Sequence, residues 1–307
     1  MRLIRMTVAA FGLLAMAAPV AAEDHAKSPH GPDDTIGAAN NLSLEGVLAA
    51  SKLVKTGKTY PLGVITGRNS PAYPGRAFDI EVFPIPEGGA NKVTGHDDRL
   101  VSHVGIGSQL DGLGHIGVDK VHYNGITAEE IFDPKGLKKL GTEHVPPIVT
   151  RGVLIDIAAH RGVAQLAPMA SFGSAEIQAA AKAQGVTIGK GDVVLFHTGW
   201  LSKADEDPAV YIGQQPGINA DGAKYLAELG VVAVGADSAA LETMDFGTDG
   251  NLFPVHAMLL AHYGVYILET MNTADLARDK AWEFMFVLGQ PRFAGSVQAV
   301  INPVAIR

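Results

Sequence analysis

The 307-residue sequence contains no cysteine. This excludes disulfide cross-links, a thiolate nucleophile and thiolate metal ligands, so any metal must be held by His, Asp, Glu and amide or carbonyl oxygens. No cluster of Lys and Arg follows the first few residues, and the formal net charge is -8. Binding of nucleic acid depends on neutralising phosphates with a basic face. We therefore predict a small-molecule substrate and no nucleic-acid partner.

Two common catalytic fingerprints are also missing. There is no GxSxG motif, so a serine hydrolase has little support. The Gly105–Gly107 pair forms a GxG, but the third glycine of a dinucleotide fingerprint is not at its place and no helix is predicted to begin there. The sequence therefore does not favour a cofactor-dependent oxidoreductase.

The one long apolar run lies at the N-terminus. Arg2 and Arg5 precede an apolar stretch from Met6 to Ala18, and small residues lead to Ala22. The run is shorter than the ~20 residues that span a bilayer, and its flanks are typical of a secretory signal peptide. We predict that residues 1–22 are cleaved, giving a periplasmic or secreted protein that is not membrane-bound. Residues 23–34 are polar and predict a flexible lead-in.

Residues 35–307 predict one domain, because no linker, repeat or low-complexity tract divides them. Buried strands are expected where β-branched runs occur, around Val153 to Ala158 and Val193 to Trp200, and strands alternate with helices in the second half. The first half is richer in short strands. The pattern predicts an α/β (α+β) fold, a single domain with a mixed β-sheet and flanking helices.

The segment from His103 to His115 has the strongest chemical signal. Arg99 to Asp111 alternates with period two, which predicts a half-buried strand with His103, Gln109 and Asp111 on one face. The glycines of this segment would let a ligand or metal approach, and His115 follows a turn that could return it to Asp111. The same pattern also fits a solvent-facing strand whose polar side has no function.

Two other candidate site residues, Glu269 and Asp237, stand at the C-terminal ends of apolar runs. Glu269 ends VYILE, with His256 on the preceding predicted helix, and a carboxylate there is costly unless it is paired or metal-bound. Asp237 ends VVAVGAD, where it either faces a site or caps the next turn. Trp200 follows a predicted buried strand, where it either belongs to the core or lines a pocket. We retain Trp200 and Asp237 as candidate substrate-binding residues.

Several segments together resemble a known family. They are DDTIGAANNLS, QLDGLGH, RGVLIDIAA, GDVVLFHTGW, PGIN, VGADSAALE, FPVHAMLL and GVYILE, and they cover most of the chain in the family's order. The chain resembles the cyclase family of metal-dependent hydrolases, which includes bacterial kynurenine formamidase and isatin hydrolase. The resemblance implies a swivelling β/β/α-like fold, a homo-oligomer (dimer or tetramer) and hydrolysis of a small amide, lactam or formamide, cyclic and aromatic ones included.

The family motif HxGTHxDxPxH matches this sequence in part. Its aspartate and last histidine are kept as Asp111 and His115, while its two metal-binding histidines are replaced by Gly105 and Gln109 and its proline by Leu113. The match implies that Asp111 is a metal ligand and His115 the general acid/base. His256 and Glu269 look similar to the later ligands of the family, and we take His115 and Glu269 as the catalytic candidates.

The loss of two imidazoles predicts an unusual metal site. Gln109 would offer a weak amide oxygen, and His103 would reach in from the same predicted strand face. With Asp111, Glu269 and either His103 or His256, the site is oxygen-rich and predicts one divalent ion, Mn²⁺ or Zn²⁺, with Mg²⁺ also open. The alternative is a periplasmic small-molecule-binding or catalytically inactive relative of the family.

Overall fold

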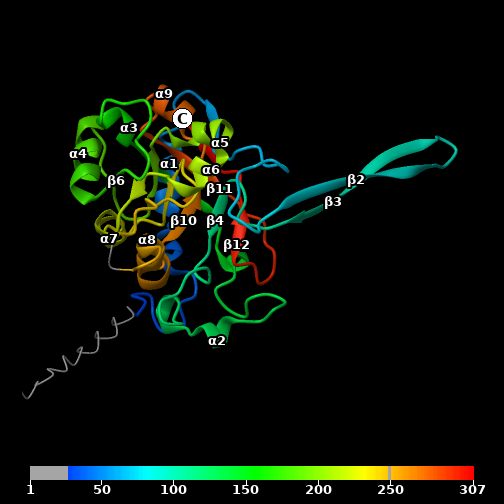
Figure 1. Cartoon of the computed structure of the whole chain (residues 1–307), viewed down its shortest axis with the longest axis horizontal. Coiled ribbons are helices and arrows are strands. Elements are labelled where there is room, and N and C mark those ends of the chain that lie inside the picture. Colours follow the sequence, from blue (N-terminus) through cyan, green and yellow to red (C-terminus); the bar gives the residue numbers. More distant parts are fainter. Residues whose placement is uncertain (1–26, 248–249) are drawn as a thin grey trace, which may run out of the picture.

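A nine-stranded mixed sheet forms the centre of the molecule (Figure 1). The structure, a computed structural model, describes residues 27–247 and 250–307. The strand order is β1-β13-β11-β5-β7-β9-β10-β4-β12, with parallel pairing from β5 through β10 and antiparallel pairing elsewhere. The predicted single domain with a mixed sheet and flanking helices is confirmed. The predicted signal peptide lies outside the described residues.

The strands of the large sheet are β1 (Thr59–Pro61), β4 (Gln109–Asp111), β5 (Ile148–Asp156), β7 (Val193–His197), β9 (Ala233–Ala236), β10 (Tyr266–Glu269), β11 (Glu283–Leu288), β12 (Gln298–Val300) and β13 (Val304–Ile306). Two short strands, β6 (Ser171–Phe172) and β8 (Gly217–Ile218), pair separately. The parallel strands are apolar along most of their length and buried, as in α/β proteins whose sheets are covered on both faces.

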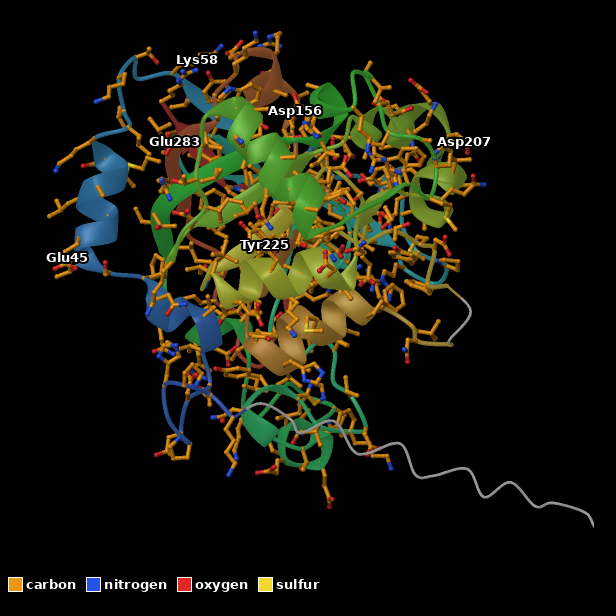
Figure 2. The ribbon with its side chains drawn as sticks, turned by 90° about the vertical axis from the view of Figure 1, so that its left-hand side faces the viewer. Glu45, Lys58, Asp156, Asp207, Tyr225 and Glu283 are labelled. Carbon is orange, nitrogen blue, oxygen red and sulfur yellow. The ribbon has the colours of Figure 1, made fainter. Side chains whose placement is uncertain are left out.

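The helices are short. They are α1 (Leu44–Ser51), α2 (Ala128–Ile131), α3 (Ile157–His160), α4 (Ser174–Gln184), α5 (Lys203–Glu206), α6 (Pro208–Gly213), α7 (Ala220–Glu228), α8 (Pro254–His256) and α9 (Ala274–Arg278). A π-helix, Ala257–Tyr263, continues α8. The π-helix packs against α7, and α7 packs against α4. Figure 2 shows α7, which carries Tyr225, beside the π-helix. No helix in the described residues is long and apolar enough to cross a membrane.

A long hairpin projects from this body (Figure 1). Its strands, β2 (Phe78–Gly88) and β3 (Val93–Ser102), pair with each other. Large apolar side chains are exposed along it: Ile80, Val82, Phe83, Ile85, Val93, Leu100 and Val101. We call residues 78–102 the arm. An isolated two-stranded hairpin is only marginally stable in water, so the exposed apolar residues of the arm require an explanation.

The structure corrects the strand predicted from Arg99 to Asp111. β3 ends at Ser102 and β4 begins at Gln109, so a non-strand segment separates them. Gly107 in that segment has a φ of 73°, a left-handed conformation that interrupts a strand. The alternation arose from two elements, an exposed arm and a fully buried short strand, and not from one half-buried strand.

The lead-in predicted as flexible is anchored where the structure describes it. The side-chain amide of Asn124 donates to the carbonyls of Gly31 and Asp34, each at 3.0 Å. The Tyr123 hydroxyl donates to the Asp34 carboxylate at 2.7 Å. Hydrogen bonds to a loop about 90 residues away are not visible in local composition, which explains why the sequence predicted flexibility here.

Candidate metal centre

Three neighbouring strands, β10, β4 and β12, bring four polar side chains to one face of the sheet. Gln109 and Asp111 are two residues apart and therefore point to the same side. In the antiparallel register Glu269 of β10 is opposite Gln109, and Gln298 of β12 is opposite Asp111. Directly opposed residues of antiparallel strands have neighbouring side chains on a common face. The register alone therefore gathers these four residues.

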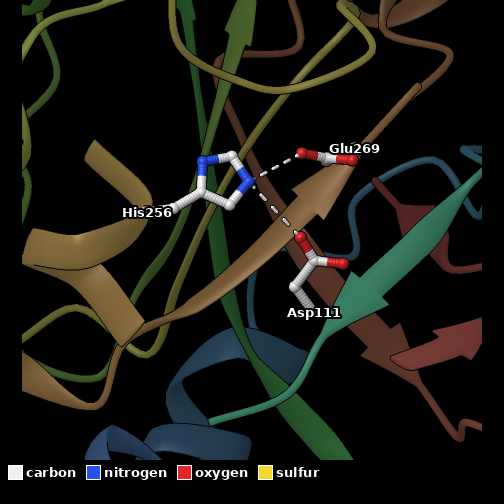
Figure 3. A group of neighbouring side chains, drawn as sticks. All are labelled: Asp111, His256 and Glu269. Atoms are coloured by element: carbon white, nitrogen blue, oxygen red, sulfur yellow. Dashed lines mark hydrogen bonds and ion pairs between the residues drawn. The ribbon is translucent and has the colours of Figure 1, made fainter. Parts of the chain in front are cut away.

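Asp111, His256 and Glu269 form a buried group in which one ligand atom from each lies within 4.8 Å of the others (Figure 3). His256 Nε2 lies 3.2 Å from Glu269 Oε1 and 3.5 Å from Asp111 Oδ2. The three side chains come from α8, β10 and β4, and they converge at the end of β10 (Figure 3). One imidazole and two carboxylates are the donor types that Mn²⁺ and Zn²⁺ accept in proteins.

Glu242 fixes the orientation of the His256 ring. His256 Nδ1 lies 2.5 Å from Glu242 Oε1. The Glu242 carboxylate also accepts the backbone N–H groups of Val255 and His256, at 3.1 and 3.0 Å. A carboxylate that accepts one ring N–H of a histidine leaves the other nitrogen free to bind a metal, and this arrangement is common around metal-binding histidines. With Nδ1 held by Glu242, Nε2 is the ring nitrogen that faces the two carboxylates.

Two glutamines hold the carboxylates in place. Gln298 Nε2 donates to Asp111 Oδ1 at 2.7 Å. Gln109 Nε2 donates to Glu269 Oε2 at 2.5 Å and reaches Asp111 Oδ1 at 3.3 Å. The amide-oxygen ligand predicted for Gln109 stays a prediction, and its amide nitrogen here contacts the two carboxylates. Gln109 belongs to the group as a residue that positions its ligands.

The electrostatics of the group follow from burial and mutual charge. Burial and the neighbouring Asp111 charge raise the pKa of Glu269 to about 8. Burial also disfavours the Asp111 charge, but His115, His256 and Gln298 outweigh it and lower the pKa of that carboxyl. Burial opposes a charged His256, yet the neighbouring carboxylates of Asp111, Glu242 and Glu269 raise its pKa well above the usual value. Without a metal, the group therefore retains protons that a divalent cation would replace.

One atom identifies where a cation is needed. Asp111 Oδ2 is buried and accepts no hydrogen bond among the described residues. A buried carboxylate oxygen without a partner is costly, and coordination to a metal removes that cost. This oxygen, Nε2 of His256 and the Glu269 carboxylate together fit a single divalent ion.

A cavity of about 180 Å³ opens beside this group. Its lining includes Tyr73, Arg76, Gln109, His115, Phe253 and Glu269. His115 Nε2 lies 3.9 Å from Asp111 Oδ2, so the predicted turn does return this histidine to the aspartate. Burial lowers the pKa of His115, although the nearby Asp111 carboxylate opposes this effect. The cavity thus combines a candidate proton carrier with the candidate metal ligands.

His103 is not part of the group. It is exposed at the base of the arm, where Nδ1 accepts the Ala77 backbone N–H at 2.9 Å. The prediction that His103 shares a strand face with Asp111 fails because β3 has already ended at Ser102. Of the two histidines considered as ligands, His256 is the one that the fold brings to the carboxylates.

Trp200 and Asp237 also lie outside the cavity lining. Trp200 is fully buried, packs with Tyr211 and donates its indole N–H to the Tyr211 carbonyl at 3.1 Å. The Asp237 carboxylate accepts the backbone N–H groups of Thr198 and Gly199, at 3.0 and 2.8 Å. These bonds hold the turn after β7, so the structural alternative for each residue fits its surroundings better than contact with a substrate.

The structure adds residues that the sequence did not single out. Glu242 ends the apolar run Ala239-Ala240-Leu241 and is itself buried, the same signal that pointed to Glu269. Tyr73 and Arg76 come from an irregular loop, and Gln298 from an edge strand. No local periodicity marks these last three, because their positions depend on tertiary contacts.

Comparison with known proteins decides the family. Residues 56–243 match the model of the Cyclase family, described as "Putative cyclase". The chain belongs to this family. The match confirms the resemblance that the motifs implied. No curated protein matches the chain.

Solved structures of cyclase-family proteins share the fold. A structure described as a novel cyclase is 28% identical, with a TM-score of 0.81 over 91% of this chain and 98% of that chain. An isatin hydrolase bound to the product analogue thioisatinate is 17% identical, with a TM-score of 0.60 over 86% and 98%. Isatin hydrolase A from Ralstonia solanacearum is 16% identical, with a TM-score of 0.63 over 87% and 98%. The last two likenesses concern the fold alone.

Proposed function

We propose that this cyclase-family chain is a metal-dependent hydrolase of a small amide, lactam or formamide. The observation that carries the proposal is the buried group of Asp111, His256 and Glu269 at the wall of a cavity that also contains His115. Family membership supports the reaction class, and the isatin hydrolases with the same fold act on a cyclic amide. The three ligand side chains would hold one divalent ion, Mn²⁺ or Zn²⁺, with Mg²⁺ also open.

A divalent ion held by Asp111, His256 and Glu269 would supply Lewis acidity, which can lower the pKa of water from about 15.7 towards about 7 and polarise the scissile carbonyl. The side chains supply the remaining functions. Glu242 keeps the His256 ring in its tautomer and orientation, and Gln109 and Gln298 hold the two carboxylates. These contacts restrict the ligand atoms to one arrangement before the substrate enters.

His115 is the proposed general acid/base. It faces the cavity, and imidazole is the side chain best suited to exchange protons near neutral pH. In this role Nε2 accepts a proton from the attacking water and returns it to the leaving nitrogen. We propose Glu269, the second catalytic candidate from the sequence, as a metal ligand whose carboxylate also borders the cavity.

The proposal is tested by a metal-resolved activity screen. Purified protein is stripped with a chelator, reloaded separately with Mn²⁺, Zn²⁺ or Mg²⁺, and assayed on small lactams, N-formyl compounds and cyclic imides. Turnover that depends on the added metal supports the hydrolase. If no metal binds and none restores turnover, the alternative of a small-molecule-binding or inactive relative is favoured instead.

The cellular location and the oligomeric state of the protein stay predictions. We propose export to the periplasm or outside the cell from the N-terminal signal pattern. We also propose a homo-oligomer, which the exposed apolar residues of the arm support because a second copy would shield them from water. Light scattering of the purified protein, and mass determination of the exported chain, test these two statements separately.

A further inference from the structure

Arg76 is the arginine of the cavity lining. It belongs to the loop before the arm, and two contacts hold its guanidinium. Nη1 donates to the Gly105 carbonyl at 2.6 Å, and the guanidinium carbon lies 5.4 Å from the centre of the Tyr73 ring. A cation–π contact with an aromatic ring and one hydrogen bond hold the guanidinium at the wall of the cavity.

Within residues 27–247 and 250–307, Arg76 forms no ion pair with a carboxylate. Five other arginines in the same part of the chain do so: Arg68, Arg99, Arg151, Arg161 and Arg278. A guanidinium has five N–H donors in a planar fork that matches a carboxylate. Arg76 therefore borders the cavity with N–H donors that form no ion pair with an Asp or Glu carboxylate among the described residues.

Gly105 makes room for this cation. A Cβ atom at residue 105 would lie 2.4 Å from Arg76 Nη1 and 2.9 Å from Gln298 Oε1. Any side chain there would displace the guanidinium from its present position. The position of the Arg76 guanidinium therefore depends on glycine at residue 105.

The rest of the lining suits an apolar body. Ile116, Ala240 and Phe253 border the cavity together with Tyr73. The metal ligand group lies at the same cavity, represented in its lining by His256 and Glu269. A ligand there meets three surfaces: a metal centre that fits a carbonyl, apolar side chains, and a guanidinium that fits an anion.

We propose that Arg76 binds a carboxylate of the substrate, so that the substrate class is a small apolar or aromatic amide that carries a carboxylate. The inference rests on the proposed hydrolase function for the identity of the scissile bond. Arg76 is a specificity residue in this proposal. It forms a charge-assisted, two-pronged pair with the carboxylate while the amide carbonyl lies at the metal group.

The test compares two N-formyl arylamines that differ only in a ring carboxylate. In the metal-loaded wild type, kcat/KM for the carboxylate compound should exceed that for the neutral one by roughly 10- to 100-fold, the usual effect of a hydrogen-bonded charge pair. Arg76→Gln should reduce that ratio at least about tenfold, chiefly through KM. Arg68→Gln, whose guanidinium pairs with Asp79 outside the cavity, is the matched control and should keep the wild-type ratio.

A binding measurement separates this inference from the hydrolase proposal. Calorimetry with benzoate and with benzamide should show that the wild type prefers benzoate and that Arg76→Gln loses this preference. Gly105→Ala, which displaces the guanidinium without removing it, should give the same loss. If neither N-formyl compound is hydrolysed while benzoate binding still depends on Arg76, the hydrolase proposal fails and the anion site stands. Equal binding of benzoate by wild type and Arg76→Gln, or an unchanged ratio of kcat/KM, overturns the anion site.

Discussion

The Glu242→Gln variant probes how the fold prepares His256 for a metal. In the wild type, the Glu242 carboxylate accepts the Nδ1 proton of His256 and the backbone N–H groups of Val255 and His256. The substitution keeps the shape of the side chain but replaces one acceptor oxygen with an NH₂ group. One of these N–H donors must then face another donor, and the negative charge that supports the imidazole is lost.

The expected magnitude follows from these contacts. Removing a carboxylate that supports a metal-binding histidine typically weakens metal affinity by about 10- to 100-fold, or about 1.4–2.7 kcal/mol. A buried N–H left without an acceptor adds a stability loss of about 1–3 kcal/mol to the metal-free protein. We therefore expect both a higher metal Kd and a lower Tm.

Competition with a chromophoric chelator measures the Kd for Mn²⁺ and Zn²⁺ in the wild type and the variant. Glu176→Gln is the control, because Glu176 pairs with Arg161 on the surface and does not belong to the metal ligand group. A Glu242→Gln protein whose Kd stays within twofold of the wild type refutes the reasoning. In that case His256 would not owe its ligand geometry to Glu242.

Three further predictions address individual side chains. His115→Ala should lower turnover by about 10²- to 10⁴-fold with unchanged metal content; near wild-type turnover would exclude it as the acid/base. Asp237→Ala leaves the N–H groups of Thr198 and Gly199 without their acceptor, so unfolding in urea should show a loss of about 3 kcal/mol while metal affinity is unchanged; a lower metal affinity would return Asp237 to the site. Burial opposes the charge of His197, but Asp237 outweighs it and raises its pKa above 6.5. The extra free energy of unfolding of the wild type relative to His197→Gln should therefore be fully present below about pH 6.5 and be lost as the pH rises through the raised pKa of His197. Equal differences in the free energy of unfolding at about pH 5.5 and about pH 8.5 would contradict this.

The sequence predicted the parts of the site that end buried strands. Glu269 was found because an apolar run that ends in a carboxylate has an unmet electrostatic cost. The same argument applies to Glu242, although its run is short and lies outside a regular element. The sheet itself was predictable because its parallel strands are continuous apolar runs that alternate with helices.

The remaining features depend on contacts between distant segments. The alternation from Arg99 to Asp111 combined the exposed arm with β4, and a non-strand segment that contains Gly107 separates them. The grouping of Gln298 with Asp111 follows from the register of β12 on β4, which no local pattern encodes. Arg76 reaches the cavity from a loop, where sequence periodicity carries no information.

The metal content of the purified protein tests the central claim most directly. After loading with Mn²⁺ or Zn²⁺ and removal of excess ion, elemental analysis should give one divalent ion per wild-type chain. Asp111→Asn and His256→Asn should each retain far less, since each removes one of the three ligands. A wild-type chain that binds no divalent ion, or variants that keep the full equivalent, would contradict a metal centre built from Asp111, His256 and Glu269.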